Sequence, residues 1–185
     1  GEELLTLKES YPYGGDVSYS VDGTQIASCG SESISLWNAE TGDKLRTLYG
    51  NFRVSRSVSF SPDGARIAVG CDDGTSDGYV DTIRIWDVAS GEEVMTFRGD
   101  KENIVGVLFS PDGKQLAAVT RSTIRLFNAT TGVELWSFKG ELSAECFAFS
   151  RDGARIAVGG SNSVITVLDV VTKNVLERMR DQTIS

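Results

Sequence analysis

Residues 54–87 decide the fold, and they read VSRSVSFSPDGARIAVGCDDGTSDGYVDTIRIWD. A first strand is predicted over Val54–Phe60, and Ser61-Pro-Asp-Gly64 then supplies a turn that reverses the chain. The apolar run Arg66–Cys71 has the length of a second strand, and Thr82–Trp86 alternates polar and apolar residues as a third strand does. This stretch therefore predicts short strands that follow one another through tight turns.

The same landmarks return along the whole chain. Ser-x-Asp-Gly occurs four times, with its glycines 41, 49 and 40 residues apart at Gly23, Gly64, Gly113 and Gly153. An aromatic or apolar residue followed by Asp or Asn ends the third strand at Trp37-Asn38, Trp86-Asp87, Phe127-Asn128 and Leu168-Asp169. A fourth strand follows, as at Glu93–Arg98 and Glu134–Lys139. We predict an all-β fold with approximate repeats at 1–41, 42–90, 91–131 and 132–172, and with 173–185 as the last outer strand and a tail.

Composition excludes several kinds of site. The 185-residue chain has 18 Lys and Arg against 26 Asp and Glu, and its net charge of −8 disfavours nucleic acid and anionic membranes as partners. Histidine is absent from the sequence, which excludes a Ser-His-Asp nucleophile and a His-ligated zinc site. Cys29, Cys71 and Cys146 predict buried, reduced thiols of a cytosolic protein. We expect a cytoplasmic protein that has no cofactor and is not an enzyme, with chemistry by carboxylates alone left open.

The repeat resembles the tryptophan-aspartate (WD) repeat, most closely at Ser61-Pro-Asp-Gly64 and Ile83-Arg-Ile-Trp-Asp87. That family forms β-propellers, whose four-stranded blades surround a central channel. The resemblance implies that Trp37 and Trp86 lie in the core. It also gives a structural role in turns to one aspartate of each repeat, namely Asp22, Asp63, Asp112 and Asp152. The Gly-His dipeptide of the family is missing, since the corresponding pairs are Glu9-Ser10, Gly50-Asn51, Gly99-Asp100 and Gly140-Glu141.

The resemblance implies a non-enzymatic scaffold that binds a protein or peptide. The binding surface expected in the family, here called the loop face, carries two kinds of connection. Fourth strands are joined to the next first strands by Glu9–Asp16, Gly50–Ser55, Gly99–Ile104 and Gly140–Glu145. Second strands are joined to third strands by Gly30–Ser33, Asp72–Asp81, Thr120–Ser122 and Gly160–Ser163. A regulatory or sensor segment of a larger multidomain signalling protein is an alternative function.

Aromatic and arginine residues on the loop face are the candidate binding residues, because these residue types dominate interface hot spots. The candidates are Tyr11, Tyr13, Phe52, Arg53, Tyr79 and Arg121. Packing beneath the loops is the competing interpretation of Tyr11 and Phe52.

An insertion within Cys71–Asp81 causes the irregular spacing of 49 residues. It brings four carboxylates, Asp72, Asp73, Asp77 and Asp81, into a connection of the loop face. The order of Asp73, Thr75, Asp77 and Gly78 is similar to a calcium loop, with Asp73 and Asp77 as weak metal candidates, but Arg84 stands where such a loop has its glutamate. A calcium-dependent or enzymatic propeller is therefore a second alternative, beside a solvated hairpin tip and a partner contact.

Strand counting raises the question of completeness. Residues 1–8 match the fourth strand of a blade whose first three strands are missing, and four blades follow. Proteins of the resembling family close with about seven blades. We expect either a piece of a larger propeller or a ring that a second chain or self-association completes.

Overall fold

The computed structural model describes residues 5–8, 15–74, 80–98 and 102–180. In these ranges the chain forms four antiparallel sheets of four strands each, and the strands of every sheet follow one another in sequence order. Each sheet is one blade, and the all-β prediction is confirmed. Within the same ranges, no helix has the length and apolarity needed to cross a bilayer.

The strands follow the predicted pattern in all four blades. The first blade contains β1 (Val17–Tyr19), β2 (Gln25–Cys29), β3 (Ser33–Asn38) and β4 (Lys44–Tyr49). The second contains β5 (Val54–Phe60), β6 (Arg66–Asp72), β7 (Asp81–Asp87) and β8 (Glu93–Arg98). The third contains β9 (Ile104–Phe109), β10 (Gln115–Thr120), β11 (Thr123–Asn128) and β12 (Glu134–Lys139). The fourth contains β13 (Ala144–Phe149), β14 (Arg155–Gly160), β15 (Val164–Asp169) and β16 (Val175–Arg180).

The Ser-x-Asp-Gly turns have one geometry throughout. In the second blade, Ser61 Oγ donates to Asp63 Oδ1 at 2.5 Å, and Asp63 Oδ1 also accepts the Ala65 amide at 3.0 Å. Gly64 has a φ of +70°, a conformation that residues with a side chain rarely adopt. Asp22, Asp112 and Asp152 accept the same pair of hydrogen bonds in their own turns.

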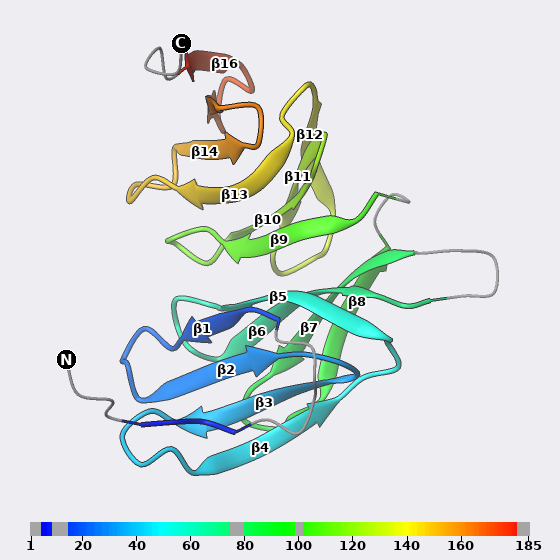
Figure 1. The fold of residues 1–185 in the computed structure, drawn as a ribbon, viewed down its shortest axis with the longest axis vertical. Helices are drawn as coiled ribbons and strands as arrows, with labels where there is room; N and C mark the ends of the chain where they lie inside the picture. Colours follow the sequence, from blue (N-terminus) through cyan, green and yellow to red (C-terminus); the bar gives the residue numbers. More distant parts are fainter. Residues whose placement is uncertain (1–4, 9–14, 75–79, 99–101, 181–185) are drawn as a thin grey trace.

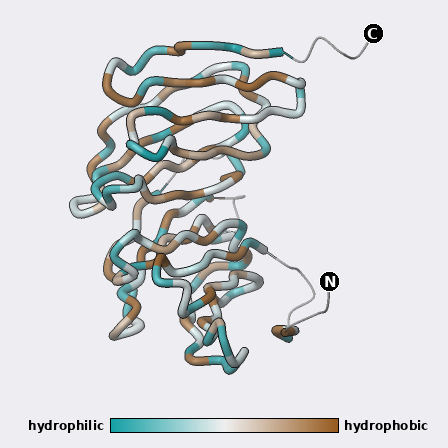
Figure 2. Tube along the Cα trace, turned by 90° about the vertical axis from the view of Figure 1, so that its left-hand side faces the viewer, coloured by the Kyte–Doolittle hydropathy of each residue, from teal (hydrophilic) through white to brown (hydrophobic). Residues whose placement is uncertain are grey.

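Three apolar layers hold the four blades together, one between each pair of neighbours. Trp86 is 1% exposed and belongs to the layer between the first and second blades. Trp37 is also buried, and its indole nitrogen donates to Ser28 Oγ at 2.8 Å. Figure 2 shows hydrophobic stretches along the strands of all four blades.

The first strands of the four blades, β1, β5, β9 and β13, lie along the inner edge of the assembly (Figure 1). Serine side chains connect three of them to one another. Ser18 Oγ accepts the Phe60 amide at 3.2 Å, and Ser57 Oγ accepts the Val107 amide at 3.1 Å. The blades therefore form an arc whose concave side carries the first strands.

Among the described residues, the first and fourth blades each leave part of one sheet face exposed, although β3 of the first blade is buried on both faces. Val17 and Tyr19 of β1 are 67% and 63% exposed, and Ile165 of β15 and Met179 of β16 are 46% and 41% exposed. By contrast, nearly all residues of β6 and β10, in the middle blades, are buried on both faces.

Two expectations about the termini and the thiols need correction. Residues 5–8 form no strand, so the predicted outer strand over residues 1–8 is wrong for its described part; residues 1–4 lie outside the described residues. Leu5 lies instead over the turn glycine Gly42. A Cβ atom added to Gly42 would be 2.9 Å from Leu5 Cδ1. Cys29 and Cys71 are buried as expected, and burial raises the pKa of the Cys71 thiol to about 12, but Cys146 is exposed on the uncovered face of the fourth blade.

Candidate functional site

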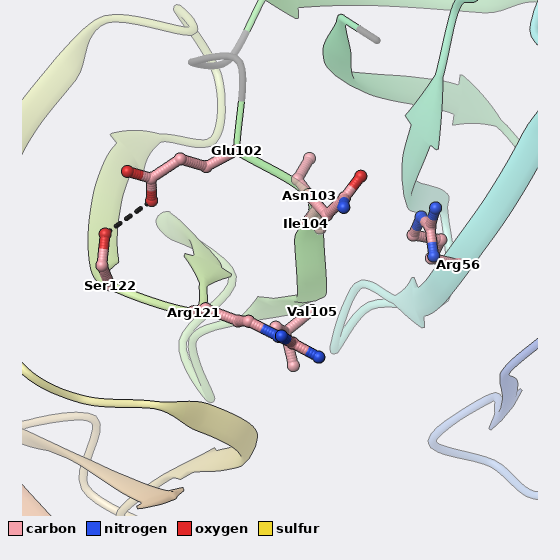
Figure 3. Close-up of a pocket in the computed structure, with 7 residues that line it drawn as sticks. All are labelled: Arg56, Glu102, Asn103, Ile104, Val105, Arg121 and Ser122. Atoms are coloured by element: carbon pink, nitrogen blue, oxygen red, sulfur yellow. Dashed lines mark hydrogen bonds between the residues drawn. The ribbon is translucent and has the colours of Figure 1, made fainter.

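An open cavity of about 620 Å³ lies on the loop face where the second and third blades meet (Figure 3). Its lining residues are Arg56, Glu102, Asn103, Ile104, Val105, Arg121 and Ser122. They come from β5, from the connection that leads into β9, from the start of β9, and from the β10–β11 turn. Both kinds of loop-face connection therefore contribute to one cavity.

Arg56 reaches this cavity because β5 contains a bulge. Ser55 pairs with Cys71 and Ser57 pairs with Gly70, so Arg56 has no opposite residue on β6. A bulge turns the side chain of the extra residue out of the regular alternation of a strand. The third and fourth blades have the same irregularity in β9 and β13, before Gly106 and Cys146.

Glu102 fixes the shape of the cavity wall on the third blade. Its Oε2 atom accepts hydrogen bonds from Thr120 Oγ1 at 2.8 Å and Ser122 Oγ at 2.6 Å, and Lys139 Nζ lies 3.6 Å from its Oε1 atom. The hydrogen bonds from Ser122 and Thr120 lower the pKa of Glu102. This carboxylate joins the connection before β9 to the β10–β11 turn. Because it binds Thr120 and Ser122, it holds the residues on both sides of Arg121.

Arg56 and Arg121 carry the unpaired charge of the cavity. Both side chains are exposed, and neither guanidinium group makes a hydrogen bond or an ion pair with the residues that the structure describes. In Figure 3 the Arg121 side chain runs toward Val105, while Glu102 points the other way, toward Ser122. The cavity therefore presents two cationic groups that form no ion pair with the described residues, and the one carboxylate of its lining, Glu102, points away from Arg121.

A buried pair of carboxyl groups lies next to this region. Asp72 and Asp81 are opposite each other on β6 and β7 and are only 1% and 2% exposed, so the interpretation of this connection as a solvated hairpin tip is wrong for these two residues. Asp72 accepts the backbone amides of Gly74 at 2.9 Å and Val80 at 3.4 Å. At this end, β6 and β7 each extend one residue further than the apolar pattern predicts, so Asp72 and Asp81 both lie within the sheet.

Asp81 lacks such partners: among the described residues, neither of its carboxyl oxygens accepts a hydrogen bond of normal geometry. Burial, with further contributions from the negative charges of Asp72 and Glu102, raises the pKa of Asp81 to about 6, against the opposing effects of the Ile104 amide and Arg56. The group is thus close to half protonated at mildly acidic pH, within the electrostatic reach of Arg56.

Asp73, one of the two metal candidates, is committed to an ion pair. Arg84 contacts the Asp73 carboxylate at 2.9 Å and the Glu93 carboxylate at 2.7 Å, and it donates to the Asn51 carbonyl at 3.1 Å. Although burial opposes the charge, hydrogen bonds to Glu93 and Asp73 raise the pKa of Arg84. Asp77 lies outside the described residues, and in the part of the chain that is described no three acidic or cysteine side chains are grouped as metal ligands would be.

Of the three predicted binding residues that the structure describes, only Arg121 lines the cavity. Phe52 is 4% exposed and packs edge-on against Trp86, with ring centroids 6.1 Å apart, so its assignment to binding is wrong and the packing interpretation is correct. Arg53 is exposed and lies over Gly74, outside the cavity. Tyr11, Tyr13 and Tyr79 lie outside the described residues.

Three comparisons relate this architecture to known proteins. The family described as "WD domain, G-beta repeat" matches residues 42–75 and 91–128. A comparison with curated proteins found no match. Among solved structures, the chain is similar to the β-propeller domain of Cps50 (Swd1) from Myceliophteria thermophila, with a TM-score of 0.79 and 18% sequence identity. That match covers 98% of this chain but 59% of the other, so the likeness shows the fold and extends over part of a larger propeller.

Proposed function

We propose that this chain, which folds into propeller blades and matches the WD repeat model at residues 42–75 and 91–128, is a non-enzymatic scaffold that binds a protein or peptide on its loop face. Rigid blades that present loops are common docking platforms, although fold alone does not assign function. The observation that carries the proposal is the meeting of both kinds of connection around open, polar cavities on that face.

A second cavity of about 490 Å³ extends the first toward the fourth blade. The two share Arg121 and Ser122, and the second adds Gly140–Ser143 with Ser161 and Asn162. Together the two adjoining cavities form one surface that is open to solvent. Such a surface suits an extended peptide better than a small molecule, because small-molecule sites are usually enclosed by apolar walls.

Backbone hydrogen bonds hold the walls of this surface. The Gly140 amide donates to the Ser122 carbonyl at 2.9 Å, and the Ala144 amide donates to the Arg121 carbonyl at 3.1 Å. The Ser161 amide donates to the Ser143 carbonyl at 3.0 Å. Preorganised walls reduce the entropy lost on binding, which supports a docking role.

The proposal is tested by selecting peptides on the immobilised chain from a random display library and then blocking the loop face. Asn103→Tyr and Ser161→Tyr place bulky neutral side chains in the two cavities and should abolish capture of the selected peptides. Thr130→Tyr is the matched control, because Thr130 is exposed in the β11–β12 turn at the opposite end of the blades. Equal capture by all three variants would overturn the loop-face assignment.

The exposed strand β1 of the first blade and the exposed face of the fourth blade support a second part of the proposal, which concerns assembly. We infer that further propeller blades cover these faces, as the partial match to a larger propeller domain suggests. Sheets of a repeat protein stabilise one another mainly through such contacts between neighbours.

A further inference from the structure

The cationic groups of the first cavity point to the chemistry of what binds there. Arg56 and Arg121 come from different blades, yet both line this cavity, and neither makes a hydrogen bond or ion pair with the described residues, although Arg56 acts electrostatically on Asp81. Arg84 and Arg125 show the contrast, because each is paired with a carboxylate. A guanidinium group offers a fork of N–H donors that matches carboxylate and phosphate oxygens.

No acidic group among the described residues forms an ion pair with Arg56 or Arg121, although Glu141 lines the adjoining cavity with Arg121, and Asp16 and Glu145 line another with Arg56. Glu102 accepts hydrogen bonds from Thr120 and Ser122 and lies near Lys139, so its charge is already compensated. Asp81 is buried beside the Ile104 backbone rather than among the residues that line the cavity. The remaining exposed polar side chain of the lining is Asn103, whose amide can also donate to an anion.

We propose that this cavity recognises an oxyanion on the bound protein or peptide, namely a carboxylate or phosphate group, through Arg56 and Arg121. The inference rests on the proposed function, since it specifies the chemistry of the same surface. With a net charge of −8, the chain as a whole repels anions, so selectivity for an acidic group must come from a local pair of cations.

The experiment uses three pools of fluorescent peptides that are random except for a central glutamate, phosphoserine or glutamine. Fluorescence anisotropy measures the binding of each pool to the wild-type chain and to the Arg56→Gln/Arg121→Gln variant. The wild-type chain should bind the glutamate or phosphoserine pool at least about tenfold more tightly than the glutamine pool, as expected for charge-assisted hydrogen bonds. The double variant should bind all three pools within about twofold, and added salt should weaken only the wild-type preference.

The matched control is Lys114→Gln/Arg151→Gln, which removes the same charge from exposed turns at the opposite end of the blades and should keep the preference. Phosphoserine bound more tightly than glutamate assigns a phosphate, and equal binding of the two shows that a carboxylate suffices. If the glutamine pool binds equally well, or if the double variant keeps the preference, the inference fails while the proposed function stands. If no pool and no library peptide binds the wild-type chain, the proposed function fails as well.

Discussion

Asp81 is the residue whose charge should make stability most sensitive to pH. Its pKa is raised to about 6 in the folded chain, above the value of about 4 expected when unfolded. The folded state therefore binds the proton more tightly, so this contribution to stability is complete below about pH 4 and is lost as pH rises through about 6. Asp81→Asn removes the titrating group.

We expect the free energy of unfolding of the wild type to fall relative to that of Asp81→Asn as the pH rises from 4 to 7.5. The difference should change by on the order of 2 kcal/mol in favour of the variant. Urea unfolding at several pH values measures this difference. Glu40→Gln, at an exposed turn position, should show no such trend. A difference that is constant with pH would show that the carboxyl group of Asp81 is as easily ionised in the fold as outside it.

The two tryptophans Trp86 and Trp136 should differ strongly in their contribution to stability. Trp86 is 1% exposed and packs against Phe52, whereas Trp136 is half-buried on the outer strand β12. Trp86→Ala should cost about 4 kcal/mol through the cavity that it leaves, and Trp136→Ala about 1 to 2 kcal/mol. Denaturant unfolding gives both values, and Trp86→Phe provides a milder variant that keeps an aromatic ring. Equal losses at the two positions would contradict the burial of Trp86.

At the scale of the elements, the strands were predictable because the repeat supplies the same local signals four times. The bounds of β5, β8 and β12 agree with prediction, whereas β6 ends one residue later than predicted and β7 is one residue longer at each end. The bulge at Arg56 was not predictable, because it depends on pairing with β6 and not on any local residue preference.

The burial of Phe52 depends on a long-range contact as well. Gly50 has no side chain, and a Cβ atom there would overlap the Phe52 ring, which occupies the space beside Trp86. Phe52 is therefore part of the core and not a binding residue at a loop tip. Of the site, the sequence indicated the loop face and Arg121 but not Arg56, Glu102 or the burial of Asp81.

The junction between β9 and β13 should be the weakest link between neighbouring blades. Ser57 and Ser59 of β5 accept the amides of Val107 and Phe109 at 3.1 and 3.3 Å. By the spacing of the Ser-x-Asp-Gly turns, the equivalent positions of β9 are Gly106 and Leu108, which have no hydroxyl group. The ring of Phe147 packs over Gly106 instead.

We therefore expect hydrogen exchange in β13 and β14 to be faster than in β9 and β10 by about tenfold or more, because regions with fewer stabilising contacts open more often. Mass spectrometry of peptides from the two blades measures the ratio. Ser59→Ala should raise exchange in β9 while leaving β13 unchanged. Equal protection of the two blades in the wild-type chain would show that apolar contacts alone hold the fourth blade as firmly as the third.

At the scale of the whole molecule, the arc exposes apolar side chains at both ends. Tyr19 lies on the exposed strand β1 of the first blade, and Ile165 lies on the exposed face of the fourth blade. Exposed apolar patches and strand edges favour association. The 185-residue chain alone should therefore bind a hydrophobic dye and sediment above its mass of 19.9 kDa.

Substitutions can separate the uncovered faces from other exposed apolar positions. Tyr19→Ser/Ile165→Ser should lower both dye binding and the sedimenting mass while circular dichroism stays that of the wild type. Val94→Ser is the control, because Val94 is 53% exposed on the outer strand β8 and not on an uncovered face of the arc. A wild-type chain that sediments as a monomer and binds no dye would show that the two faces need no cover, and the inferred further blades would lose their physical basis.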